Sequence, residues 1–300
     1  MTAGPVLVAG ASGFVGRRLT QALVDAGHDV RAMTRRPDAY EGPGTPTYGD
    51  VHDAASLPEA MRGCSAAYYL VHSLDSPDFE RLDAEAARAF GTAAAEAGLT
   101  QIVYLGGLGR DTDDLSAHLR SRREVERLLG EAGVPVTVLR AGIVVGNGGL
   151  SWELTRQLVQ HLPAMVTPRW VRTRTQPIAV GDVVRYLVGV LGHPDAVGRV
   201  FEVGGPEVLE YRTMLKRVAA IENRRLLIVP IPLLTPGLSS LWLSLVTDVD
   251  TATGRALVDS MTNEVVVEDD AIRKIVPFEP TGYDDAVREA LEERRRERVR

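Results

Sequence analysis

The chain has 300 residues, a formal net charge of −6 and 45% hydrophobic residues. This length exceeds a typical single core, so we expect one large α/β domain with a second lobe. The acidic balance argues against a nucleic-acid partner, because phosphates require a basic surface. Cys64 is the single cysteine, which excludes an intramolecular disulfide and favours a reducing compartment. We interpret Cys64 as a buried core thiol rather than a nucleophile.

The sequence does not indicate a membrane location. The N-terminus leads directly into an apolar run at residues 6–9, which leaves no room for a signal peptide. The most apolar later stretch, residues 226–246, contains Pro230, Pro232 and Pro236, so we do not expect a straight spanning helix there. We expect a soluble cytoplasmic protein without a transmembrane segment.

A glycine pattern follows the first apolar run. Gly10 permits a tight turn, Gly13 lets the backbone approach a pyrophosphate, and Gly16 lets the following helix pack closely on the strand. The free N–H groups and the positive dipole end at the helix N-terminus suit phosphates. The pattern predicts a dinucleotide site, and the alternative is a strand–turn–helix unit that binds nothing. The other cofactor-binding candidates in this loop are Ser12, Phe14 and Val15.

Predicted strands and helices alternate through the first half of the chain. We expect strands at residues 6–9, 30–33, 66–71, 102–105 and 136–139. Three of the intervening helices end at Gly27, Gly98 and Gly133, where the left-handed conformation of glycine closes a helix. This alternation implies a doubly wound parallel sheet of the Rossmann type, with ligands at the carboxyl ends of the strands.

The second half of the chain is less regular. In chain order we expect a helix at 152–162, an irregular basic loop at 163–174, a helix after Gly181, a strand at 200–203, an edge strand within 224–232 and a solvated, frayed helix end at 291–300. We assign residues 1–146 plus about 176–203 to the dinucleotide-binding domain. The smaller discontinuous lobe then comprises residues 147–175 plus 204–300.

Two segments of the smaller lobe have more than one interpretation. Residues 168–175 carry three arginines and Trp170, which suit an anionic or quinone-like ligand or form a solvated loop with one packed tryptophan. A helix predicted at 235–246 has an apolar side, which could pack on the smaller lobe, dock a partner or lie on a bilayer surface.

The second predicted strand ends in Thr34, Arg35 and Arg36, where NAD-binding folds usually place Asp or Glu. A carboxylate there would repel a 2′-phosphate, whereas Thr34 can donate to it and a guanidinium can clamp it. We predict NADP(H) over NAD(H), and the alternative is that both arginines are solvated loop residues. Asp50 and Val51, after the third predicted strand, are expected to contact the adenine.

These motifs resemble the short-chain dehydrogenase/reductase superfamily in its extended and atypical forms, over nearly the whole chain. The matching segments are the glycine loop and residues 49–51, 68–72, 139–146, 176–183 and 203–206. More narrowly, the chain is similar to the atypical branch that contains NmrA-like regulators and the NADPH-binding accessory subunit of respiratory complex I. The resemblance implies that the cofactor is also lined by Leu70, Val71, His72, Gly106, Gly107, Ala141, Gly142 and Ile143.

The catalytic residues of that superfamily are a Ser or Thr after one strand and a Tyr-x-x-x-Lys on the next helix. Here Gly107, His118 and Arg122 stand at these three positions. Arg122 could hold the ribose but does not titrate at working pH. His118 could be a general acid whose cation is disfavoured by Arg122, or a helix-surface residue without a role. Tyr69 and His72 are alternative proton donors.

Two functions from different classes fit these features. The first is an NADPH-dependent reductase of a small carbonyl, enone or quinone, with His118 or solvent supplying the proton and Arg122 holding the ribose. The second is a non-catalytic NADPH-binding module that acts on a protein partner as a redox sensor or assembly protein. An epimerase or dehydratase is disfavoured, because oxidation of a sugar hydroxyl relies on the missing tyrosine. The six histidines show no metal-ligand spacing, so we expect no metal site.

Overall fold

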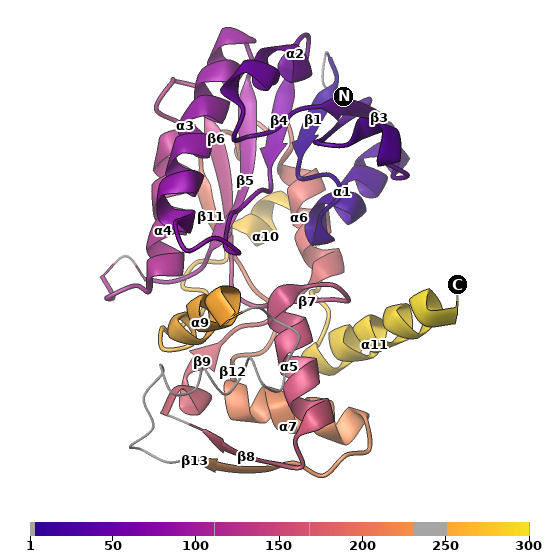
Figure 1. Cartoon of the computed structure of the whole chain (residues 1–300), viewed down its shortest axis with the longest axis vertical. Helices are drawn as coiled ribbons and strands as arrows, with labels where there is room; N and C mark the ends of the chain where they lie inside the picture. Colours follow the sequence, from indigo (N-terminus) through magenta and orange to yellow (C-terminus); the bar gives the residue numbers. More distant parts are fainter. Residues whose placement is uncertain (1–3, 111, 168, 231–250, 300) are drawn as a thin grey trace.

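Seven parallel strands form the central sheet of the computed structural model, which describes residues 4–110, 112–167, 169–230 and 251–299 (Figure 1). In spatial order these strands are β11 (Val200–Val203), β6 (Val136–Ala141), β5 (Gln101–Gly107), β4 (Ala66–Tyr69), β1 (Val6–Ala9), β2 (Val30–Thr34) and β3 (Thr45–Tyr48). Every pairing within the sheet is parallel. The predicted doubly wound Rossmann-type fold is confirmed, including the strand at 200–203 that returns to the sheet.

Helices cover both faces of the sheet. One face carries α1 (Phe14–Asp25), α6 (Val180–Val190) and α10 (Ile272–Ile275), and the other carries α2 (Leu57–Met61), α3 (Phe79–Glu96) and α4 (Ala117–Leu129). All four residues of the central strand β1 are apolar because both of its faces are covered by helices. Val8 packs toward α1 and α6, and Leu7 packs toward α2 and α3, so neither face is solvated. Cys64 is buried among the residues of the second face, as predicted, and burial raises the pKa of its thiol.

The smaller lobe lies at the carboxyl ends of the strands (Figure 1). Its elements are β7 (Val144–Val145), α5 (Leu150–His161), β8 (Ala164–Thr167), β9 (Arg174–Thr175), β10 (Ile178–Ala179), β12 (Leu209–Glu210), α7 (Tyr211–Ile221), β13 (Leu227–Pro230), α9 (Thr251–Ser260) and α11 (Tyr283–Val299). Its core includes Trp152 and Met214, which are each 1% exposed. Short 3-10 helices at Pro37–Ala39, Ala54–Ser56 and Arg169–Arg172 complete the described elements.

The structure replaces the predicted basic loop at 163–174 with regular elements. β8 pairs in parallel with β13, and β9 pairs antiparallel with β12, so each strand depends on a partner distant in sequence. Trp170 is 7% exposed and packs edge-on against Tyr211, with 5.8 Å between ring centroids. Arg174 pairs with Glu264 at 2.8 Å. Of the two interpretations of this segment, a packed tryptophan is therefore the one that the structure supports.

Two C-terminal segments contact the sheet domain. The segment containing Ile272 and Phe278, which the predicted division places in the smaller lobe, packs on the sheet domain, where Phe278 lies 4.6 Å from Tyr186. The last turn of α11 is solvated as predicted, since residues 295–298 are exposed, and one turn earlier Glu293 accepts a hydrogen bond from Arg18 of α1. The helix predicted at 235–246 lies outside the described residues. None of the helices that the structure describes is long and apolar enough to cross a bilayer.

We expect Gly91→Ala to destabilise the fold by about 1–3 kcal/mol, because α3 and α4 leave no room for a side chain there. A Cβ at Gly91 would lie 2.6 Å from the carbonyl oxygen of Leu129. Gly181 is the matched control, since a Cβ on this helical glycine meets nothing within 4 Å. Gly181→Ala should stabilise by up to about 1 kcal/mol. Urea denaturation of both variants tests the pair, and equal midpoints would contradict this packing.

Candidate functional site

The glycine loop has the geometry that its spacing predicts. Gly10 has φ +87° and its carbonyl accepts a hydrogen bond of 2.9 Å from the N–H of Gly13. A Cβ at Gly16 would lie 1.9 Å from the Gly10 oxygen, so only glycine fits there. Gly13 caps α1 without a side-chain hydrogen bond, which leaves the first N–H groups of the helix available to a ligand. The loop is therefore a backbone cradle of the shape and polarity that a pyrophosphate needs.

An inner cavity of about 300 Å³ opens between this loop and the ends of β4, β5 and β6. Its lining includes Gly10, Gly13, Phe14, Val15, Gly16, Leu70, Val71, His72, Gly106, Gly107, His118, Arg122, Ala141 and Gly142, all of which the sequence singles out. Sequence reasoning missed Leu74, Leu105, Val144, residues 148–151 and Leu257, which complete the wall. The missed residues 148–151 carry a double glycine before α5, and this signal could have identified them as a ligand-facing turn.

An outer cavity of about 330 Å³ continues from Gly10 along the ends of β2 and β3. It brings together the remaining candidates for the adenosine half of the cofactor, namely Ser12, Thr34, Arg35, Arg36, Asp50 and Val51. Arg35 and Arg36 are exposed, and within the described part of the chain neither guanidinium has an ion-pair partner. Asp50 is fixed in orientation, since its carboxylate accepts a hydrogen bond of 3.0 Å from the backbone N–H of His52.

A side cavity of about 80 Å³ adjoins the inner cavity, and the two share His118, Gly142 and Ser151 in their walls. Ile143, which the sequence also singles out, lines this side cavity rather than the inner one. The other apolar wall residues are Leu108, Leu119, Leu257, Met261 and Val265. Gly107, Ala141, Tyr211 and Ser260 complete the wall. The side cavity is therefore a small, mainly apolar space next to the inner cavity.

A buried ion pair fixes Arg122 in the wall of the inner cavity. Its guanidinium pairs with Asp83 of α3, and the two side chains are only 8% and 2% exposed. Asp83 also accepts a hydrogen bond of 2.8 Å from the backbone N–H of Ser73. Nε of Arg122 is buried and has no hydrogen-bond partner in the described residues. Asp83 was missed because it lies 39 positions earlier, on a different helix.

His118 lies in the cavity wall rather than on the solvent face of α4. It lines both the inner and the side cavities, and its buried Nδ1 has no hydrogen-bond partner among the described residues. Burial, followed by the charge of Arg122 and the neighbouring His72, lowers the pKa of His118 to about 3. The imidazole is therefore neutral at neutral pH.

Tyr69 does not reach the cofactor cavities, so it is excluded as an alternative proton donor. Its ring is 1% exposed and packs beneath α3, 4.9 Å from Phe90 and 6.1 Å from Tyr104. Burial raises the pKa of its hydroxyl. The physical reason is the period of the strand, because alternate side chains of β4 point to opposite faces. His72, the other alternative donor, lines both the inner and the outer cavities.

The folded protein should lose stability through His118 as the pH falls below 6.5. The unfolded state takes up a proton there with a pKa near 6.5, whereas the folded state resists protonation down to about pH 3. Lowering the pH from 7.5 to 5.5 should therefore reduce the free energy of unfolding of the unmodified protein by about 1 kcal/mol more than that of the His118→Gln variant. Urea denaturation at both pH values measures the difference. His161→Gln, at an exposed position, is the control, and equal losses in all three proteins would contradict a His118 that stays neutral in the folded protein.

Known proteins similar to this chain include a reductase and a subunit of NADH dehydrogenase (ubiquinone). The chain is 31% identical over 233 residues to (4-alkanoyl-5-oxo-2,5-dihydrofuran-3-yl)methyl phosphate reductase of Streptomyces griseus. This match covers 74% of this chain and 75% of that protein. It is 24% identical over 239 residues to NADH dehydrogenase (ubiquinone) 1 alpha subcomplex subunit 9, mitochondrial, of Mus musculus, which covers 75% of this chain and 63% of that protein.

Solved structures with the same fold include two complexes with cofactor. The NADPH-dependent quinone oxidoreductase of Escherichia coli, complexed with NADPH, has a TM-score of 0.78 at 17% identity and covers 94% of this chain and 98% of that chain. The triphenylmethane reductase of Citrobacter sp., complexed with NADP(H), has a TM-score of 0.77 at 16% identity, with coverage of 95% and 99%. Residues 10–194 match a protein family described as NAD(P)H-binding. The chain therefore belongs to the NAD(P)H-binding family within the atypical short-chain dehydrogenase/reductase superfamily.

Proposed function

We propose that this protein is an NADPH-dependent reductase of a small carbonyl, enone or quinone. The observation that carries the proposal is the side cavity, whose mainly apolar wall adjoins the inner cavity at His118 and Gly142. NADPH supplies a hydride when bound, so an acceptor must lie directly beside its nicotinamide. The side cavity offers such a place for a small uncharged ring or chain. The Streptomyces griseus relative is itself named a reductase, which supports the same class of reaction.

The chain's own residues divide the binding of the cofactor between them. The glycine loop would hold the pyrophosphate through backbone N–H groups, and Nε of Arg122 would donate to a ribose hydroxyl. Thr34, Arg35 and Arg36 would bind a 2′-phosphate, because they line the outer cavity and carry two positive charges. This charge is the basis for proposing NADP(H) over NAD(H).

The neutral state of His118 limits how the acceptor is protonated. A neutral imidazole donates a hydrogen bond to a substrate oxygen but is a poor acid, so the proton comes from solvent. Quinones and enones suit this site better than simple ketones, because the anion left after hydride addition is delocalised and needs a strong acid least. We therefore place quinones and enones ahead of other carbonyl compounds as substrates.

The second candidate is a non-catalytic NADPH-binding module. Two features favour it: Gly107 and His118 replace the usual hydroxyl donors, and the mouse relative is named as a subunit of NADH dehydrogenase. A Cβ at Gly107 would lie 2.9 Å from Cδ2 of Leu119, so the position of the usual serine is closely packed. Such a module would bind NADPH tightly without consuming it.

Oxidation of NADPH by the purified protein should be detectable with at least one quinone or enone in a panel that also contains aldehydes and imines. His118→Ala should reduce turnover about fivefold to tenfold, the effect of one lost hydrogen bond, without weakening NADPH binding. The rate is followed by NADPH absorbance against a protein-free control. No turnover across the panel, with NADPH bound tightly and unchanged, would favour the non-catalytic module instead.

Replacing Arg35 and Arg36 together by alanine should weaken NADPH binding by about tenfold to a hundredfold and leave NADH binding nearly unchanged. The physical reason is the loss of charged donors to the 2′-phosphate alone. Dissociation constants for both cofactors come from fluorescence titration. Arg62→Ala, which removes an exposed arginine paired with Glu59, controls for net charge. The preference for NADP(H) is wrong if the unmodified protein binds NADH as tightly as NADPH.

A further inference from the structure

The loop between β7 and α5, residues 146–149, closes one side of the inner cavity. Gly148 and Gly149 line this cavity, together with the first residues of α5. The loop packs on the start of α1, since a Cβ on Gly149 would lie 2.8 Å from the ring of Phe14. The position of the loop therefore sets how closely the wall approaches a ligand held by the glycine cradle.

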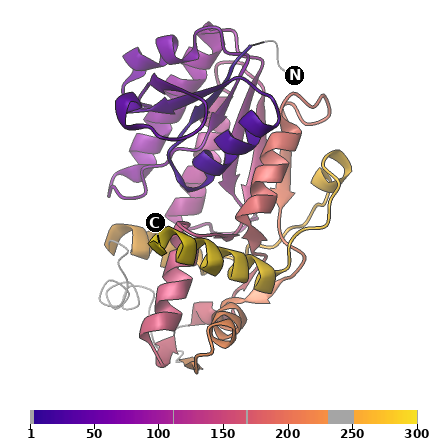
Figure 2. The ribbon, with the colours of Figure 1, turned by 90° about the vertical axis from the view of Figure 1, so that its right-hand side faces the viewer.

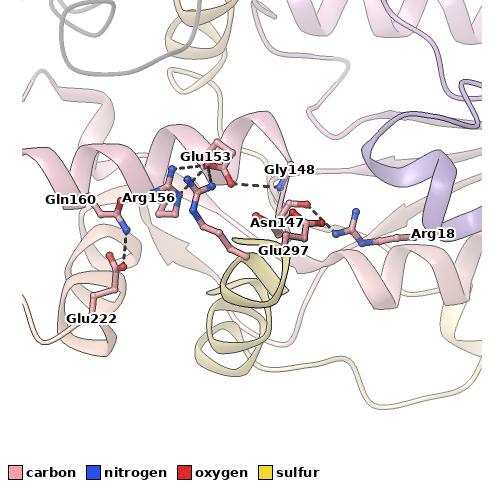
Figure 3. Close-up of polar contacts among 9 residues, drawn as sticks. Arg18, Asn147, Gly148, Glu153, Arg156, Gln160, Glu222 and Glu297 are labelled. Carbon is pink, nitrogen blue, oxygen red and sulfur yellow. Dashed lines mark hydrogen bonds and ion pairs between the residues drawn. The ribbon is translucent and has the colours of Figure 1, made fainter. Parts of the chain in front are cut away.

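Arg18 and Asn147 attach this loop to both the first and the last helix of the chain. Arg18 donates to the backbone oxygen of Asn147 at 3.0 Å (Figure 3). It also donates to Glu293 of α11 at 2.5 Å. Asn147 is 3% exposed, and its amide donates to Glu297 of α11 at 2.7 Å. Arg17 lies 3.6 Å from the same Glu297 carboxylate. Asn147 is the one residue of the loop with a side chain, and α11 holds it through a charge-assisted hydrogen bond to Glu297.

A second set of contacts holds the other end of the loop. Oε1 of Glu153, on α5, accepts a hydrogen bond of 3.5 Å from the N–H of Gly148 (Figure 3). Oε2 of Glu153 accepts from Arg294 of α11 at 3.1 Å and from the buried Arg156 at 2.8 Å. Figure 2 shows α11 lying across the boundary between the sheet domain and the smaller lobe. Side chains of α11 therefore reach the loop directly and also through α5.

We propose that the last turns of α11 position the 146–149 loop for the cofactor, so that Glu297 and Glu293 are positioning residues for NADPH binding although neither lines the cavity. Binding free energies are reciprocal, so NADPH in turn stabilises the docking of α11 by the same factor. The inference rests on membership of the NAD(P)H-binding family and not on the reductase activity. Its tests therefore measure binding and hydrogen exchange, which are independent of the acceptor assay.

Glu297→Gln should weaken NADPH binding about threefold to tenfold, because Asn147 loses a charged acceptor and the loop loses its anchor. Glu292→Gln is the matched control. Glu292 lies on the same helix and pairs only with the exposed Arg296 at 3.4 Å among the contacts that the structure describes. Dissociation constants from fluorescence titration should differ between the two variants. Equal affinities in both variants and in the unmodified protein would overturn the proposal and leave α11 as an anchor of the fold only.

The exchanged pair N147D/E297Q supplies a second test, because it restores a hydrogen bond with donor and acceptor reversed. N147D alone places two carboxylates face to face and should weaken NADPH binding more than E297Q alone. The double variant should recover to within about threefold of the unmodified protein, a positive coupling in the double-mutant cycle. If the losses of NADPH affinity in the two single variants simply add up in the double variant, the proposal is overturned, because the contact between positions 147 and 297 then does not affect NADPH binding.

Hydrogen exchange provides a further test, because NADPH would not change the exchange rates of α11 if this helix only stabilised the fold. NADPH should slow amide exchange across residues 290–299 in the unmodified protein and in Glu292→Gln, and should slow it less in Glu297→Gln. Unchanged exchange in the presence of saturating NADPH would overturn the proposal. Failure of the unmodified protein to bind either NADPH or NADH would overturn it as well, together with the proposed reductase. Binding without turnover would overturn the reductase alone.

Discussion

The absence of a side chain at Gly16 is the constraint on which the cofactor end of the molecule depends. With a Cβ there, α1 would collide with the Gly10 carbonyl, so α1 could not lie against the glycine turn. Because it does lie there, the first turn of α1, which no side chain caps, lines the inner cavity, and Phe14 packs on the 146–149 loop. The position of Arg18, one turn further along, follows from the same approach.

A second constraint is electrostatic and sets the charge states of two residues in the wall of the inner cavity. The Arg122–Asp83 pair is buried, so the charge of Arg122 acts on its neighbours through a medium of low dielectric constant. One of these neighbours is His118, whose protonated form is disfavoured by burial first and by Arg122 second. The arginine at the usual lysine position therefore also suppresses the acid at the usual tyrosine position. The cavity wall therefore combines a fixed cation at Arg122 with a neutral imidazole at His118.

The sequence alone predicts the sheet domain and most of the cofactor-facing residues, because both depend on local patterns. β1 follows from four consecutive apolar residues, and α1 follows from the glycine spacing beside it. Residues whose roles depend on distant partners could not be predicted in this way. Asp83 gives no local sign that it faces Arg122, and the Glu–Arg alternation near Glu297 is equally typical of a solvated helix. Strand β8 was missed for the same reason, since its partner β13 lies about sixty positions away.

The contacts of α11 also have a consequence for the order in which the cavity forms during synthesis. Arg18 and Glu293 are separated by 275 positions, and Asn147 and Glu297 by 150. The glycine cradle and the sheet can assemble from the emerging chain, as domains generally do during translation. The wall opposite the cradle gains its anchor only when the last helix has left the ribosome. A nascent chain can therefore form the sheet and the glycine turn before α11 anchors the 146–149 loop beside them.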